Sequence, residues 1–181
     1  SHPFFDGMWS PEGRPTFRIK AISDLPHIQE CSFYTHLGTH MDAPFHMYKD
    51  GRTIDQFPPS KFVGGGVILN IPKTRLEAVT SEDLKNAKPD VRERDIVLIS
   101  TGWEEKFGTE EYSESPYLTE DAARWLVDKN ASIVGVDLPS VDLPRTLRKT
   151  GFTRQVHLTL LKYNILVIEN LTNLKGVAGR R

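Results

Sequence analysis

The sequence predicts a single α/β domain. Short apolar runs rich in β-branched residues alternate with amphipathic helical segments along most of the chain, a pattern typical of strands and helices packed in layers. The length of 181 residues suits one domain with a sizeable core, and two domains are the weaker alternative. Apolar residues make up 38% and charged residues 26% of the chain, which indicates a globular protein. We therefore expect residues 1–181 to form one domain.

The first part of the chain predicts an arm followed by extended strands. Residues 1–16 are rich in proline and glycine and are expected to form an extended arm or loop. The segments FRIKAI (17–22) and IQECSFYTHL (28–37) alternate and carry β-formers, so both predict strands of antiparallel hairpins. Cys31 lies on the second strand at an odd position, whereas His36, His40 and Asp42 are even. We therefore expect its side chain to point to the opposite face, into the core.

Buried strands and helices alternate in the rest of the chain. Apolar runs predict strands at 64–71, 95–101, 131–137 and 165–171. Helices are predicted at 81–87 with a serine cap, at 119–130 with Thr119 as cap and Trp125 on the core face, and at 152–164. The glycines that open GGGVILNI do not predict a phosphate loop, because no Gly-Lys-Ser/Thr follows and the strand comes after them.

Charge and hydropathy exclude several functions. The chain has 23 lysines and arginines against 24 acids, and a net charge of −1 gives no electrostatic footprint for nucleic acid. No apolar run approaches the roughly 18 residues of a transmembrane helix. The single cysteine cannot form an internal disulfide, which fits a reducing compartment, and we predict a cytoplasmic location. Because the chain begins with Ser1, we expect that preceding residues were removed, as a signal peptide would be, or are absent.

One segment, FYTHLGTHMDAPFHMYKDG (33–51), concentrates polar groups at regular spacings. Its residues His36, His40, Asp42 and His46 are separated by four, two and four positions. Gly38 and the proline at 44 disfavour a helix here, whereas on a strand the first three residues share a face. Gly38 would leave open space on that face, and a turn at Ala43-Pro44 would aim His46 at the same point.

Two imidazoles and one carboxylate suit Zn²⁺, Mn²⁺ or Fe²⁺, and three protein ligands leave positions open for catalysis. The alternative interpretation, a set of solvated turn histidines, is disfavoured by the shared parity before a proline turn.

Other polar residues give weaker signals. His157 lies in a predicted helix, where a lone histidine is more often a satisfied core residue than a ligand. Glu169 ends an apolar strand, where a buried carboxylate is costly without a cation, and a metal would remove that cost for both. Ser140 lacks the surroundings of a nucleophilic serine. Asp137 and Asp142 are expected to stabilise turns rather than to bind metal.

The segment HLGTHMDAPFH resembles the H-x-G-T-H-x-D-x-P-x-H signature of the so-called cyclase family of metal-dependent hydrolases, which includes kynurenine formamidases and isatin hydrolases. STGW (100–103), GVDLPSVD (135–142) and IENLTNL, with His157 twelve residues before Glu169, also resemble the family. The resemblance covers nearly the whole chain, although the family's strand after the NL segment is missing. It implies a swivelling β/α/β-type fold with a mixed sheet, and a metal-activated water.

The resemblance also implies roles for individual residues. It places His36, His40 and Asp42 on the first metal and His46 as the catalytic acid/base. His157 and Glu169 would complete a second metal, with Asp42 and Glu169 as bridges. Trp9, in the arm segment GMWSPEG, roughly occupies the place of a substrate-contacting aromatic. The family further implies a homodimer or higher homo-oligomer in which such arms can complete a neighbour's site, so we expect Trp9 near a substrate pocket of its own chain or of its partner.

Metal-dependent hydrolysis of an amide or cyclic amide is therefore the predicted function, with one or two Zn²⁺ or Mn²⁺ ions per chain. By resemblance, the substrate is an aromatic formamide of the N-formylkynurenine type, as in tryptophan catabolism, or a lactam. Two alternatives stay open from the residues alone. One is a mononuclear Fe²⁺ oxygenase with a two-histidine, one-carboxylate triad. The other is a non-catalytic, metal-stabilised binding protein.

Overall fold

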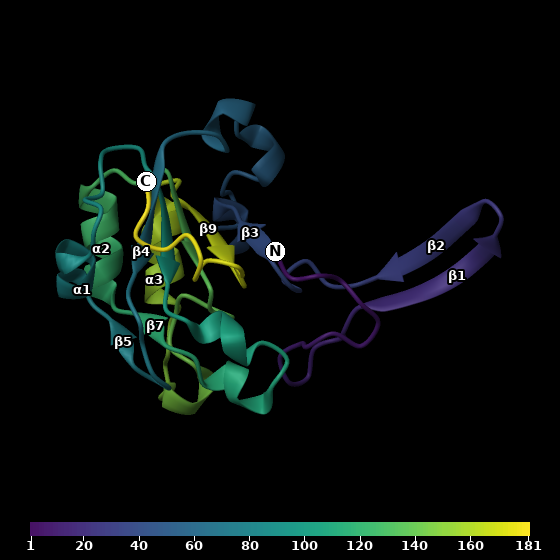
Figure 1. Ribbon diagram of the computed structural model, residues 1–181. Helices are drawn as coiled ribbons and strands as arrows, with labels where there is room; N and C mark the ends of the chain where they lie inside the picture. Colours follow the sequence, from purple (N-terminus) through teal and green to yellow (C-terminus); the bar gives the residue numbers. More distant parts are fainter.

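A mixed five-stranded sheet forms the centre of the molecule in a computed structural model that describes residues 1–181 (Figure 1). Its strand order is β3-β9-β8-β6-β4. The parallel strands are β4 (Gly66–Asn70), β6 (Ile96–Ser100), β8 (Ile133–Val136) and β9 (Leu166–Glu169). The edge strand β3 (His40–Asp42) runs antiparallel to β9. The sheet confirms the predicted α/β class.

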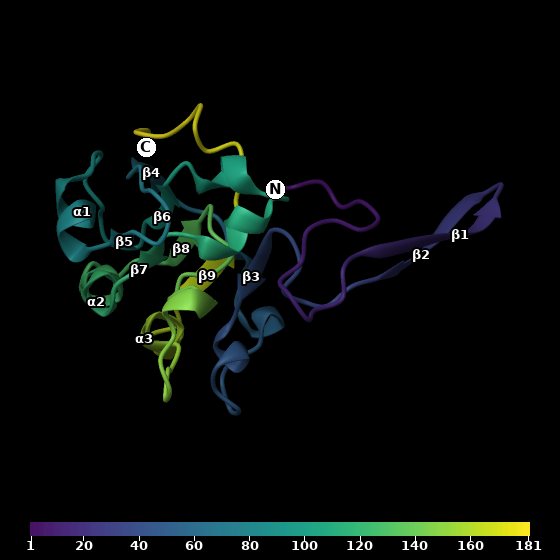
Figure 2. The same ribbon diagram turned by 90° about the horizontal axis from the view of Figure 1, so that it is seen from below.

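Three helices cover one face of this sheet (Figure 2). They are α1 (Ser81–Asn86), α2 (Glu120–Asp128) and α3 (Gln155–Lys162). The apolar face of α2 buries Ala122, Ala123 and Leu126, as the helical spacing of these residues requires. The cluster of 24 buried apolar residues that these helices share with the strands is the main core of the protein.

Short elements complete the body. β5 (Ala78–Val79) and β7 (Tyr117–Leu118) form a two-stranded parallel sheet beside the helices. Single 3₁₀ turns occupy Pro44–His46, Ile54–Gln56, Pro59–Lys61, Trp103–Lys106, Glu110–Glu114 and Arg145–Leu147. No helix combines the length and apolar character that crossing a membrane requires.

The predicted first strands form an antiparallel hairpin that projects from the body (Figures 1 and 2). Its strands are β1 (Arg18–Asp24) and β2 (His27–Ser32). The prediction for Cys31 was wrong, because this side chain is exposed. No second layer of the chain covers the hairpin, so strand parity there does not select a buried face.

The predicted strand 28–37 also ends earlier than expected. β2 stops at Ser32, residues 33–39 form a turn, and β3 begins at His40. Gly38 has a φ of +61°, a left-handed conformation that suits glycine and breaks the strand. His36 is therefore a turn residue, and its predicted place on the strand face was wrong.

The helices match their predictions with small shifts. The cap of α1 is Thr80 rather than the expected serine, and its side chain accepts from the Asp83 N–H. Thr119 caps α2 as predicted. The third helix is shorter than the predicted 152–164, since α3 spans only Gln155–Lys162. The swivelling β/α/β description and the single domain over 1–181 stay predictions.

Candidate metal centre

The edge of the sheet brings two polar segments together. β3 pairs with β9 so that His40 lies directly opposite Glu169 and Asp42 lies opposite Val167. Directly opposed residues of an antiparallel pair are close neighbours. The pairing thus joins the histidine-rich motif to a carboxylate that lies 129 positions further along the chain.

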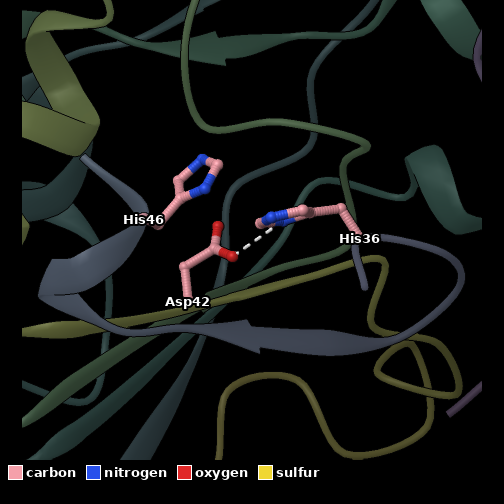
Figure 3. Close-up of side chains that lie close together, drawn as sticks. All are labelled: His36, Asp42 and His46. Atoms are coloured by element: carbon pink, nitrogen blue, oxygen red, sulfur yellow. Dashed lines mark ion pairs between the residues drawn. The ribbon is translucent and has the colours of Figure 1, made fainter. Parts of the chain in front are cut away.

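Three motif side chains converge despite the early end of the strand. His36 Nδ1 lies 2.9 Å from Asp42 Oδ1 (Figure 3) and 3.1 Å from His40 Nε2. His40 Nε2 lies 3.6 Å from Asp42 Oδ1 and 3.5 Å from Glu169 Oε2. The turn at 33–39 thus brings His36 back over β3 and places it where the strand prediction had expected a ligand.

Two overlapping triads have the spacing of metal ligands. One consists of His36, Asp42 and His46, and the other of His40, Asp42 and Glu169. The ligand atoms of each triad lie within 4.8 Å of one another. Asp42 belongs to both triads and is 3% exposed, so its carboxylate is the common point of the cluster.

His157 faces the same carboxylates from the first turn of α3. Its Nε2 lies 3.3 Å from Asp42 Oδ2 and 3.2 Å from Glu169 Oε1. The residue is only 1% exposed. Its residue type and helical setting favoured a core residue with satisfied polar atoms. The structure instead places its Nε2 among carboxylates, in the cluster.

Asp142 fixes the orientation of His157. Its Oδ2 lies 2.5 Å from His157 Nδ1, and its Oδ1 accepts the Val156 N–H at 2.9 Å. With Nδ1–H donating to this carboxylate, the Nε2 lone pair points toward Asp42 and Glu169. The prediction of a turn residue at Asp142 missed this contact. The burial of Asp142 and the start of α3 without a capping side chain of its own appear only in the structure, so no local pattern in the sequence indicated the contact.

Backbone groups hold two further members of the cluster. His40 Nδ1 lies 2.9 Å from the Gly38 carbonyl oxygen, which leaves Nε2 for the cluster. Glu169 Oε1 accepts the Val141 N–H at 3.1 Å. Asp137, in contrast, accepts from the Thr101 N–H and hydroxyl and from the Gly102 N–H, so it stabilises the turn that follows β6.

The carboxylates and imidazoles of the cluster shift one another's pKa values. Burial acts to raise the pKa of Asp42, but the neighbouring imidazoles of His157 and His36 outweigh it and hold the pKa well below its usual range. Burial acts to lower the pKa of His157, yet the carboxylates of Asp142, Asp42 and Glu169 raise it well above its ordinary value. The hydrogen bond to Asp42 also raises the pKa of His36. Each of these shifts shows that the buried carboxylates need positive charge nearby.

Two atoms at the centre have no hydrogen-bond partner. Asp42 Oδ2 and His157 Nε2 are both buried, and although they lie 3.3 Å apart, neither makes a hydrogen bond within the chain. A buried polar atom without a hydrogen bond costs about 1–3 kcal/mol. One is an anionic oxygen and the other an imidazole nitrogen, which are both ligand atoms for zinc and manganese. The residues of the centre therefore fit a divalent metal ion.

His46 lies at the exposed side of the cluster (Figure 3). It ends the 3₁₀ turn Pro44–His46, and the centroid of its ring lies 4.2 Å from that of His36 and 5.5 Å from that of His157. The surrounding protein removes water from part of the ring and so lowers the pKa of His46. Its position suits a group that faces both the centre and an incoming molecule.

Trp9 belongs to an aromatic wall of the same chain. Its ring packs edge-on against Tyr112, with centroids 4.8 Å apart, and lies 6.0 Å from Phe107. The Tyr112 hydroxyl donates to the side chain of Asn170, the residue that follows Glu169. The arm therefore packs onto its own body, and the wall is tied to the strand that carries Glu169.

The sheet and the cluster define an α/β protein with a centre of histidines and carboxylates that could hold a metal ion. A family model described as "Putative cyclase" matches residues 1–143. The chain therefore belongs to this cyclase family, which confirms the resemblance of the HLGTHMDAPFH segment.

Known relatives agree with this assignment. A kynurenine formamidase of Bacillus cereus is 33% identical over 153 residues, which cover 84% of this chain and 68% of that protein. A solved structure described as a potential metal-dependent hydrolase with cyclase activity has a TM-score of 0.78 at 26% identity, covering 94% of this chain and 78% of that one. Isatin hydrolase A from Ralstonia solanacearum has a TM-score of 0.82 at 22% identity, covering 97% and 78%, which shows the shared fold alone.

Proposed function

We propose that this protein is a metal-dependent amidohydrolase that cleaves an amide or cyclic amide with a metal-activated water. The observation that carries the proposal is the pair of buried, unpartnered atoms, Asp42 Oδ2 and His157 Nε2, at the centre of the cluster. Membership of the cyclase family and the similarity to a potential metal-dependent hydrolase support it.

Five residues are proposed as metal ligands: His36, His40, Asp42, His157 and Glu169. The shared position of Asp42 in both triads supports a bridging role for its carboxylate. One or two Zn²⁺ or Mn²⁺ ions suit this mixture of imidazoles and carboxylates. Asp142 acts through His157 as a positioning residue, because it holds the ring with Nε2 toward the centre.

A bound divalent ion would supply Lewis-acid polarisation of a carbonyl and would lower the pKa of a bound water to about 7. His46 then takes the proton from the attacking water and delivers it to the leaving nitrogen. Its exposed edge and its lowered pKa favour the neutral imidazole, which can accept that proton at neutral pH. Glu169 and Asp42 supply the negative charge that would hold the metal ion. The Val141 N–H donates to Glu169 and fixes the position of its carboxylate.

The substrate proposed is a small aromatic formamide or lactam. The names of the relatives, kynurenine formamidase and isatin hydrolase, motivate this class. The aromatic wall of Trp9, Phe107 and Tyr112 provides flat apolar surface on the arm side of the body, and Trp9 is proposed to contact the substrate ring.

The test is metal analysis of the purified protein followed by a hydrolysis screen. We expect one to two equivalents of zinc or manganese, loss of both metal and activity with chelator, and recovery on adding either ion. The screen compares N-formylkynurenine, isatin and a simple aliphatic formamide in anaerobic buffer. A folded protein that takes up no metal contradicts the proposal. Oxygen consumption with bound iron would favour the oxygenase, and metal binding without turnover would favour the binding protein.

A further inference from the structure

A second polar cavity lies at the opposite end of the parallel strands from the metal centre. Its lining includes the residues that precede β4, β6 and β8, among them Gly65, Asp95 and Ser132. Glu169, in contrast, stands at the far end of β9, which runs parallel to β8. The cavity has a volume of about 360 Å³, and only two of its twelve lining residues are hydrophobic.

The charges of this cavity do not balance. Four cations, Lys61, Arg92, Arg94 and Arg181, face two carboxylates, those of Glu93 and Asp95. Both carboxylates already have partners. Asp95 pairs with Arg181 at 3.0 Å and accepts the Arg92 N–H at 2.7 Å, and Glu93 accepts from the Asn130 amide at 3.0 Å.

Three of the cations are left without a partner. The side chains of Lys61, Arg92 and Arg94 make no hydrogen bond or ion pair within the chain. Lys61 is half-buried, and its burial together with the charges of Arg94 and Arg52 lowers the pKa of its ammonium group. Grouped cations repel one another, so a bound anion would stabilise this arrangement.

The glycines that open GGGVILNI gain a role at this cavity. Gly66 must be glycine, because a Cβ there would approach the Ile96 carbonyl oxygen to 2.5 Å. Neither packing nor a positive φ imposes glycine at Gly64 or Gly65. Neither of their N–H groups donates to any atom of the chain, and a missing Cβ lets an anion approach the backbone closely.

The backbone of Arg94 supports the same interpretation. Arg94 has a φ of +63°, which is a strained conformation for a residue with a side chain. Such strain persists at ligand-contacting positions more often than elsewhere. Glycine would avoid the strain, but it would remove a guanidinium group from the cavity.

We propose that this cavity binds the phosphate group of a small molecule. The four cationic side chains of the lining exceed its two carboxylates by two charges, which matches the charge of a phosphate dianion. Arginine forks and free backbone N–H groups are the donors that phosphate oxygens prefer. Since a water occupies about 30 Å³ of liquid, the cavity has room for a phosphate group and part of the molecule that carries it. The site is separate from the metal centre and does not depend on the proposed hydrolysis.

The test is isothermal titration at low ionic strength with inorganic phosphate and with glycerol 3-phosphate as probes. Binding should weaken steeply with added salt. Arg94→Gly keeps the left-handed backbone favourable and removes only the charge, so it should fold at least as stably as the wild type and bind each probe at least tenfold more weakly. Lys61→Ala should weaken binding similarly, whereas Lys20→Ala, a matched loss of charge on the distant hairpin, should not.

Tighter binding of glycerol 3-phosphate than of inorganic phosphate would identify an ester as the occupant, and equal binding would identify the free ion. No binding by the folded wild type would overturn the proposal. Unchanged binding by both Arg94→Gly and Lys61→Ala would overturn it as well. Metal content should stay the same in every variant.

Discussion

His40 and His46 lie four and ten positions after His36 in the same segment, yet their surroundings favour different roles. His40 is held from behind by the Gly38 carbonyl and faces Asp42 and Glu169. His46 lies at the exposed side of the cluster. We expect His40→Ala to lose both metal and activity, because a ligand is removed.

His46→Ala should keep most of the metal and lose about 10²-fold in kcat, the typical cost of a missing general acid/base. Metal analysis and kinetics on the same preparations separate the two roles. Release of the metal by His46→Ala would make His46 a ligand, which its place in a triad with His36 and Asp42 also allows.

Asp142 accepts the Val156 N–H and also contacts His157 Nδ1, and the second contact is the one that bears on the metal centre. Asp142→Ala leaves His157 without the acceptor that orients its ring, so we expect metal affinity to fall 10- to 100-fold. Asp142→Asn retains an amide oxygen that can accept from Nδ1–H and should lose less. Competition with a chelator measures the affinity, and thermal unfolding of the metal-free forms controls for damage to the start of α3. Equal metal affinity in wild type and Asp142→Ala would show that His157 needs no such support.

At the scale of elements, α1 depends on its capping box. The side chain of Thr80 accepts from the Asp83 N–H, and the Asp83 carboxylate accepts from the Thr80 N–H and hydroxyl. Partial burial acts to raise the pKa of Asp83, but these hydrogen bonds and the Lys73 ammonium outweigh it and hold the pKa below its ordinary value of 3.8. The folded state thus favours the ionised carboxylate.

This depressed pKa sets the sign of a pH effect. The stabilisation by Asp83 is fully present above 3.8 and disappears as the pH falls through the lower folded-state pKa. The wild type should therefore be more stable than Asp83→Asn at pH 7, and the difference should shrink in acid. Urea unfolding of both proteins over a pH series measures it, and any effect shared with the metal centre cancels. A difference that stays constant from neutral pH into strong acid would contradict the assignment.

At the scale of the whole molecule, the projecting hairpin is the least supported part of the chain. Ile22, Leu25 and Ile28 are 62%, 87% and 46% exposed, and an isolated two-stranded hairpin is marginally stable in water. A homodimer that buries these side chains is our proposal for how the hairpin is stabilised. Ile22→Lys should convert the dimer to monomer, whereas Val63→Lys, at an exposed apolar residue outside the hairpin, should not. Light scattering distinguishes the two, and a monomeric wild type would refute the proposal.

The N-terminal arm carries Trp9, the residue proposed to contact the substrate. Trp9 packs against Phe107 and Tyr112 of its own chain, so we expect it to contact substrate in its own subunit rather than in a partner. Trp9→Ala should raise KM several-fold and leave the metal content unchanged, because no proposed ligand is touched. An unchanged KM for an aromatic formamide in this variant would remove Trp9 from the substrate site.

Local sequence patterns were enough to predict the features that depend on neighbouring residues. Alternating apolar runs and capped helical segments predict the strands and helices of an α/β domain, since burial of one face imposes its period on the residues. The dense His-Asp segment also predicts a metal centre, because so many polar groups beside apolar strands need a partner. His36, His40, Asp42 and His46 could thus be selected before their positions were known.

Contacts between residues far apart in the chain could be read only from the folded protein. The β3–β9 register places Glu169 opposite His40. The contact with Asp142 orients the His157 ring so that its Nε2 points into the cluster. Strand parity placed His36 correctly in the cluster but for the wrong reason, and it failed for Cys31, which has no layer above it. The physical reason is the same in each case. The periodicity of a segment indicates which of its faces is buried. The residues that cover that face, or form hydrogen bonds with it, come from another part of the chain.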